Sequence, residues 1–130
     1  MTDIHLLLLA ALLTWFSLML AAFLRARSWT PEGREVGFGN REGMPEASAV
    51  AGRADRAAKN LVENMPIFLA VVLAAKMAGA APEQIAVGAH VFVWARVVFL
   101  LVYLAGIRYL RTLVFAVSVV GMGMVAFAAL

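Results

Sequence analysis

Four polar residues recur at helical spacing between positions 53 and 63. Arg53, Arg56, Asn60 and Glu63 lie three or four positions apart, so on a helix they share one face within an arc of about 80°. Ionisable side chains held in apolar surroundings cost a few kcal/mol each unless they are paired. The pattern therefore predicts a polar interior site rather than a face turned toward lipid.

A second polar set follows on another apolar segment. Arg96 and Tyr103 are seven positions apart, with Phe99 between them, so two helical turns bring both polar residues to one face. Glu63 is the only acidic residue deep enough to neutralise a mid-helix arginine. We therefore expect Glu63 and Arg96 to form an ion pair.

Two more arginines, Arg108 and Arg111, lie after this segment, and Thr112 directly follows Arg111. The five arginines that this arrangement brings together are Arg53, Arg56, Arg96, Arg108 and Arg111. Because they outnumber the one buried carboxylate, the site favours an anionic ligand. The alternatives are an internal salt-bridge network and arginine side chains that extend to lipid phosphates.

Membrane-spanning helices must position these residues. The 130 residues are 64% hydrophobic and 15% charged, with a mean hydropathy of +0.89, which is outside the balance of a soluble domain. One crossing needs about 20 apolar residues. We predict an all-α membrane protein, a four-helix bundle in one transmembrane domain over residues 1–130, with helices at about 4–24, 49–78, 83–106 and 109–130.

The connection from Arg25 to Arg56 holds most of the charges and half of the prolines and glycines. It predicts a loop with one short turn at most, lying against the mouth of the bundle. Basic residues flank the first and third connections, so the positive-inside rule places these in the cytoplasm and both termini outside. Thr2 and Asp3 stand where a signal peptide would be basic, so we expect no cleaved leader.

The residue types argue against thiol chemistry by the chain itself, metal binding and nucleic-acid binding. The chain has no cysteine, so it supplies no disulfide, thiolate or iron–sulfur ligand, and any sulfur chemistry must come with a ligand. His5 and His90 lack ligand-spaced partners, and we predict no metal site. The net charge of +3 accompanies no nucleic-acid motif, so the basic residues are interpreted as topology determinants.

Two runs resemble the MAPEG superfamily, the membrane-associated proteins of eicosanoid and glutathione metabolism. They are RADRAAKNLVENMPIF, with its Arg-x-x-x-Asn-x-x-Glu pattern, and ARVVFLLVYLAGIRYLRTLVF, in which Arg and Tyr are seven apart. The segment GNREGMPE resembles small bacterial members. The resemblance covers most of the chain and implies a homotrimer. With the orientation from the positive-inside rule, we expect it in the bacterial inner membrane with both termini periplasmic. Glutathione would lie between subunits near the cytoplasmic face.

The resemblance also implies roles for residues at matching positions. Arg56, Asn60 and Glu63 would hold the glutathione backbone, and Arg96 and Tyr103 would line the same pocket. Glutathione is thus the expected cofactor, and lipids and a hydrophobic small molecule are the expected further partners.

The remaining assignments concern the edge of that pocket and the sulfur. Arg25 or Arg27 would reach the ligand from the adjacent subunit. Arg111, beside Thr112, would lie next to the sulfur, where a guanidinium lowers the thiol pKa and favours the nucleophilic thiolate. The expected catalytic residues are Arg111 and Tyr103, with Arg53 and Arg108 at the mouth. The implied reaction is attack on a hydrophobic electrophile or reduction of a lipid hydroperoxide.

Three positions depart from the family pattern. Phe99 replaces the histidine of the prostaglandin synthase branch, Phe115 a polar group of other relatives, and Ala58 a histidine found in many members. We therefore do not expect prostaglandin-synthase activity.

Two other functions stay open. A non-catalytic lipid-binding or scaffold protein would use the same bundle, although Arg111 and Tyr103 favour the enzyme. A small drug exporter is disfavoured, because such proteins carry an acidic group in the middle of the first helix, and residues 4–24 contain none.

Overall fold

The computed structural model describes all 130 residues, which form five helices and no strand. Four helices are long and apolar enough to cross a membrane: α1 (Asp3–Ala26), α3 (Ala49–Met77), α4 (Pro82–Ala105) and α5 (Arg108–Ala128). Their bounds lie within two residues of the expected ranges. The predicted all-α architecture with four candidate membrane spans is confirmed.

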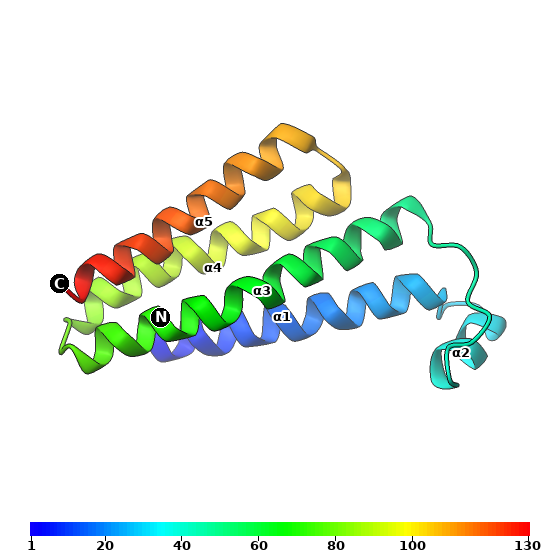
Figure 1. Ribbon diagram of the computed structural model, residues 1–130, viewed down its shortest axis with the longest axis horizontal. Helices are drawn as coiled ribbons and strands as arrows, with labels where there is room; N and C mark the ends of the chain where they lie inside the picture. Colours follow the sequence, from blue (N-terminus) through cyan, green and yellow to red (C-terminus); the bar gives the residue numbers. More distant parts are fainter.

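The long helices form two antiparallel pairs, α1 with α3 and α4 with α5 (Figure 1). The pairs lie together at the end where the α3–α4 turn and the C-terminus stand. They diverge toward the opposite end, where α3 begins and α4 connects to α5. Most of the polar residues predicted to form the site belong to this divergent half.

Glycines allow α4 and α5 to pack backbone against backbone. A Cβ added at Gly121 would lie 2.5 Å from the Phe92 nitrogen, and one added at Gly88 would lie 2.8 Å from the Gly121 carbonyl oxygen. No larger residue fits at either position without a shift of backbone. At Gly123, by contrast, an added Cβ would meet no atom within 4 Å.

The hydrophobic core occupies the half of the bundle where the pairs converge. Phe68 of α3 and Phe92 of α4 stack there with ring centroids 3.9 Å apart. Asp3 is buried and forms an ion pair with Lys76, which ties the start of α1 to the end of α3. At the divergent end, contacts between α1 and α3 are made by the small residues Ala21 and Ala58.

A fifth helix corrects the prediction of a loop between α1 and α3. Helix α2 (Pro31–Phe38) begins after Thr30, whose Oγ1 accepts a hydrogen bond from the Gly33 backbone N–H at 2.9 Å. Proline was counted as a breaker, but in the first helical turn its fixed φ and missing N–H are favourable. Among the helices α2 contacts only α1, so it does not cover the mouth of the bundle (Figure 1).

Candidate functional site

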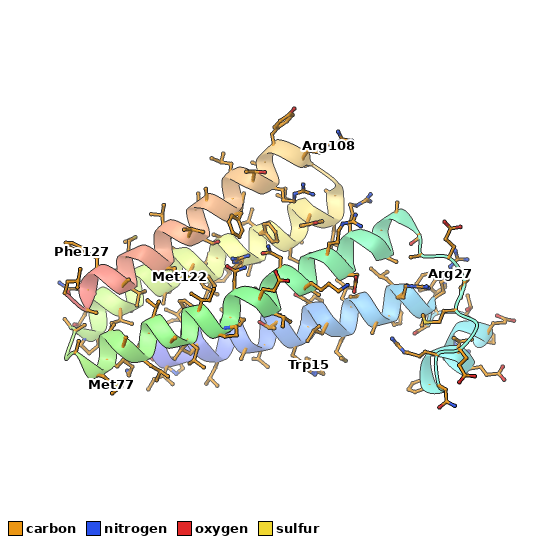
Figure 2. The ribbon with its side chains drawn as sticks, in the orientation of Figure 1. Trp15, Arg27, Met77, Arg108, Met122 and Phe127 are labelled. Carbon is orange, nitrogen blue, oxygen red and sulfur yellow. The ribbon has the colours of Figure 1, made fainter.

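An arginine-lined cleft opens where the two helix pairs diverge. It has a volume of about 500 Å³, and no acidic side chain lines it. Its basic lining residues come from the start of α3 and the start of α5: Arg53, Arg56, Arg108 and Arg111. Figure 2 shows nitrogen-bearing side chains around the α4–α5 connection near Arg108. Four of the five arginines predicted to cluster therefore line one cleft within one subunit, and Arg96 does not.

Arg53 joins the two helix pairs at this cleft. Its Nε donates a hydrogen bond to the Leu104 carbonyl oxygen at 2.9 Å, near the C-terminal end of α4. That end is closed by Gly106, whose φ of 78° favours glycine. The bond satisfies a carbonyl that the helix itself leaves free. Arg53 thus has a structural role, while Arg56 and Arg108 are exposed and free to meet a ligand.

A smaller inner pocket of about 240 Å³ shares Arg111 with the cleft. Its six lining residues are Asn60, Phe99, Tyr103, Arg111, Thr112 and Phe115. The guanidinium carbon of Arg111 lies 4.6 Å from the centroid of the Tyr103 ring, a cation–π contact that orients both side chains. The inner pocket therefore presents a guanidinium, a phenol, a hydroxyl and an amide to whatever enters from the cleft.

Arg96 lies behind the wall of this pocket rather than in it. Only 1% of Arg96 is exposed, and its Nη1 donates a hydrogen bond to Asn60 Oδ1 at 2.6 Å. The rings of Phe92, Phe99 and Phe115 surround the guanidinium, with centroids 5.0 to 5.4 Å from its central carbon. Aromatic faces stabilise a cation when water is excluded.

The predicted ion pair between Glu63 and Arg96 is wrong. Glu63 is exposed, and the ion pairs of the chain are Lys59–Asp55 and Lys76–Asp3. The reason is angular: Glu63 stands about 60° around α3 from Asn60, so the amide faces α4 while the carboxylate points outward.

The rings around Arg96 were missed as functional neighbours. Phe99 and Phe115 had been interpreted only as lost polar groups. The signal was present in the spacing, because Phe92 and Phe99 stand four residues before and three after Arg96, on the same helical face. Phe115 belongs to α5, so spacing within α4 could not predict its contact with Arg96.

Arg25 and Arg27 line neither the cleft nor the inner pocket of their own subunit. Arg25 Nη1 donates to the Pro45 carbonyl oxygen at 2.5 Å, and Arg27 ends α1 with a φ of 54°. His5 belongs to the N-terminal cap of α1, where its ring Nδ1 lies 2.9 Å from Thr2 Oγ1. Contact of Arg25 or Arg27 with a ligand in a neighbouring subunit stays a prediction.

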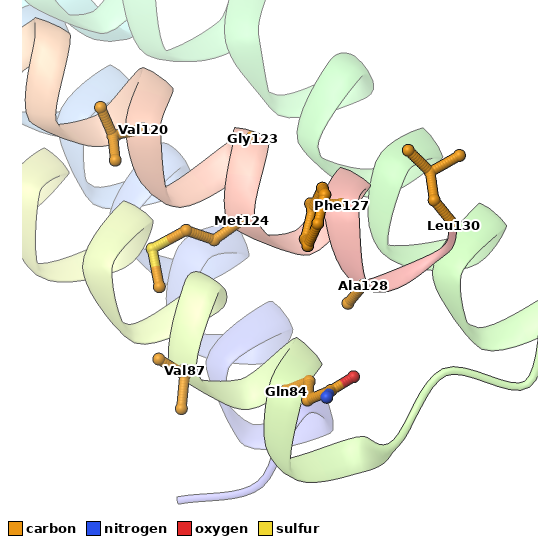
Figure 3. A pocket seen from close by; sticks show the side chains of 8 residues that line it. All are labelled: Gln84, Val87, Val120, Gly123, Met124, Phe127, Ala128 and Leu130. Atoms are coloured by element: carbon orange, nitrogen blue, oxygen red, sulfur yellow. The ribbon is translucent and has the colours of Figure 1, made fainter.

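A larger cavity of about 840 Å³ lies at the opposite end of α4 and α5 (Figure 3). Val87 and Met124 are among its mostly apolar lining, and Gln84 is its one polar side chain. This cavity has no group suited to acid–base or nucleophilic chemistry, so the candidate site is the arginine-lined cleft with its inner pocket.

Comparison with known proteins places this architecture in a family. A family model described as the MAPEG family matches residues 4–130. No curated protein matches the chain. The family match covers essentially the whole chain, including all four candidate spans and every residue of the cleft and inner pocket. The chain therefore belongs to the MAPEG family, the membrane proteins of eicosanoid and glutathione metabolism.

Proposed function

We propose that this protein is a membrane-bound glutathione-dependent transferase or peroxidase that acts on hydrophobic electrophiles. The observation that carries the proposal is the arginine-lined cleft, in which four arginines and no acid meet at the mouth of the inner pocket. Membership of the MAPEG family supports glutathione as the anion.

The charges of the cleft suit glutathione, which carries two carboxylates and one ammonium group. Arg56 and Arg108 are exposed in the cleft and can each pair with a carboxylate through two N–H groups. Glu63, one turn after Asn60 on the outer surface of α3, is an acidic residue that could meet the ammonium group.

A homotrimer would complete the site, because Glu63 faces away from its own bundle. A neighbouring subunit placed against α3 would convert that exposed surface into the wall of a pocket. Arg25 or Arg27, at the end of α1, would then supply a further cation from the neighbour. This assembly is part of the proposal and follows the family resemblance.

Within the inner pocket, Arg111 and Tyr103 would act on the sulfur. The guanidinium stabilises the thiolate, and the phenol can donate a hydrogen bond to it. In the transferase reaction, the sulfur lone pair forms a carbon–sulfur bond, and the thiol proton passes to the leaving group or to the adduct. In the peroxidase reaction, two glutathione molecules give the disulfide, while the hydroperoxide becomes an alcohol and water.

A second candidate is a non-catalytic lipid-binding or scaffold protein. It is favoured by Phe99 and Phe115, which make the wall of the inner pocket apolar where a catalytic site would hold polar groups. Such a protein would bind an acidic lipid headgroup at the same arginines and would not activate a thiol.

A binding titration separates the two candidates. The purified protein in detergent is titrated with glutathione by calorimetry, beside the variants Arg56→Gln and Lys59→Gln. Lys59 is an exposed cation of the same helix that pairs with Asp55 and lines neither pocket, so it is the matched control. We expect Arg56→Gln to weaken glutathione binding about tenfold or more and Lys59→Gln to leave it unchanged. No heat of binding in the folded wild type would overturn the proposal.

A further inference from the structure

A groove between α1 and α2 combines an apolar floor with a basic rim. We call it the α1–α2 groove; its volume is about 600 Å³. The floor is formed by residues on the outer face of α1, among them Phe16, Met19, Ala22 and Phe23. The rim includes Arg34 of α2 and Arg41 just beyond it. No residue of this groove lines the arginine-lined cleft or the inner pocket.

The floor has the depth of one leaflet of a bilayer. Phe16 precedes Ala26, the last residue of α1, by ten positions, which is about 15 Å along a helix. The hydrocarbon core is about 30 Å thick. The groove therefore runs from the membrane surface to about the bilayer centre, in the region where a lipid acyl chain is the surrounding solvent.

The rim of the groove has two arginines and no acidic side chain. Neither Arg34 nor Arg41 takes part in an ion pair. The nearby acids Glu32, Glu35 and Glu42 do not line the groove, although Ser28 does. Two guanidinium groups and a hydroxyl at the membrane surface form a site suited to a phosphate ester.

Aromatic residues flank the groove at the same level. Phe38, the last residue of α2, lines the groove and is 91% exposed. Trp29 packs on Phe23 with ring centroids 5.7 Å apart and is itself exposed. Tryptophan is enriched at membrane interfaces, so the position of Trp29 beside the groove fits a groove that opens at the membrane surface.

We propose that the α1–α2 groove binds an anionic phospholipid. The phosphate lies between Arg34 and Arg41, and one acyl chain lies along α1 from Phe23 toward Phe16. The bound lipid holds α2 against the membrane surface, although α2 contacts no other helix than α1. This site is separate from the proposed glutathione site and does not depend on it.

Native mass spectrometry of the full chain tests the lipid site. The delipidated protein in detergent receives equal amounts of phosphatidylglycerol and phosphatidylcholine with identical acyl chains. We expect the wild type to retain roughly tenfold more phosphatidylglycerol, since each arginine near the surface favours an anionic lipid. The double variant Arg34→Gln/Arg41→Gln should retain both lipids equally, while Lys59→Gln should keep the preference.

A third variant tests the floor. Ala22→Trp fills the groove and leaves both arginines in place, so it should also lower the amount of bound phosphatidylglycerol. Millimolar inorganic phosphate should not displace the lipid. If the double glutamine variant does not fold, Arg41→Gln alone, which lies beyond α2, should still reduce the preference.

Three results would overturn the lipid site. One is equal retention of the two lipids by the wild type. Another is a preference that survives the loss of both arginines in a folded variant. The last is a change in oligomeric mass caused by Ala22→Trp without any change in bound lipid, which would make the groove an interface between copies of the chain.

Discussion

Asn60 of α3 accepts a hydrogen bond from Arg96 of α4 at 2.6 Å, and this contact replaces the carboxylate–arginine pair expected from the sequence. Arg96 is almost fully buried, and its Nε and Nη2 have no hydrogen-bond partner within the chain. A neutral amide and three aromatic rings thus hold a buried cation directly behind the inner pocket. The stability of the divergent end of the bundle should depend on this contact.

Replacement of Asn60 by leucine should be strongly destabilising. Asn60→Leu removes the acceptor and leaves Arg96 buried without any hydrogen-bond partner, so we expect a loss of about 3 kcal/mol in the free energy of unfolding. The measurement is unfolding of the detergent-solubilised protein by denaturing detergent, followed by circular dichroism.

The control for this prediction is Glu63→Leu, which should change the unfolding free energy by about 0.5 kcal/mol or less, because surface substitutions usually have small effects. The double variant Asn60→Leu/Arg96→Met should recover most of the loss, since it removes the stranded charge as well. Destabilisation by Glu63→Leu as large as that by Asn60→Leu would contradict the finding that Arg96 is held by Asn60 and not by Glu63.

Much of the fold could be predicted because it follows from composition and length. Four apolar windows of the length of a membrane crossing predicted the four long helices. Helix α2 could not be predicted by counting proline and glycine as breakers. Its formation depends on the position of Pro31 directly after the cap at Thr30.

The sequence predicted which residues form the candidate site better than it predicted which of them bond to each other. Helical spacing brought the polar residues of α3 to one side, and the structure places Asn60, Tyr103, Arg111 and Thr112 around one pocket. Spacing alone could not decide between Asn60 and Glu63 as the partner of Arg96, because the choice depends on how α3 is rotated against α4.

The packing of α4 on α5 gives a second prediction. Gly121→Ala should destabilise the bundle by about 2 kcal/mol, because the added methyl group collides with the Phe92 backbone and the helices must separate. Gly123→Ala, two residues later, is the matched control and should be neutral or slightly stabilising, since its Cβ meets open space. Thermal unfolding of both variants provides the comparison; similar shifts for the two would argue against the close α4–α5 contact.

The Asp3–Lys76 ion pair leads to a third prediction. Lys76→Met leaves the Asp3 carboxylate buried without its cation, and we expect a loss of about 1 to 2 kcal/mol after allowance for the partial exposure of Lys76. Lys59→Met breaks the exposed pair with Asp55, whose side chains are 69% and 52% exposed. This loss should stay below about 0.5 kcal/mol. The denaturation midpoints of the two variants are compared with that of the wild type. A larger decrease for Lys59→Met than for Lys76→Met would contradict the structural role of the Asp3–Lys76 pair.

Activation of a thiol beside Arg111 is the fourth prediction, and ultraviolet absorbance of glutathione thiolate tests it most directly. At neutral pH, glutathione added to the wild type should give thiolate absorbance, whereas S-methylglutathione should bind without it. Arg111→Ala should abolish the absorbance and leave most of the calorimetric binding intact, because the other cleft arginines still hold the carboxylates. Full thiolate absorbance in Arg111→Ala, or none in a wild type that binds glutathione, would contradict the proposed role of Arg111.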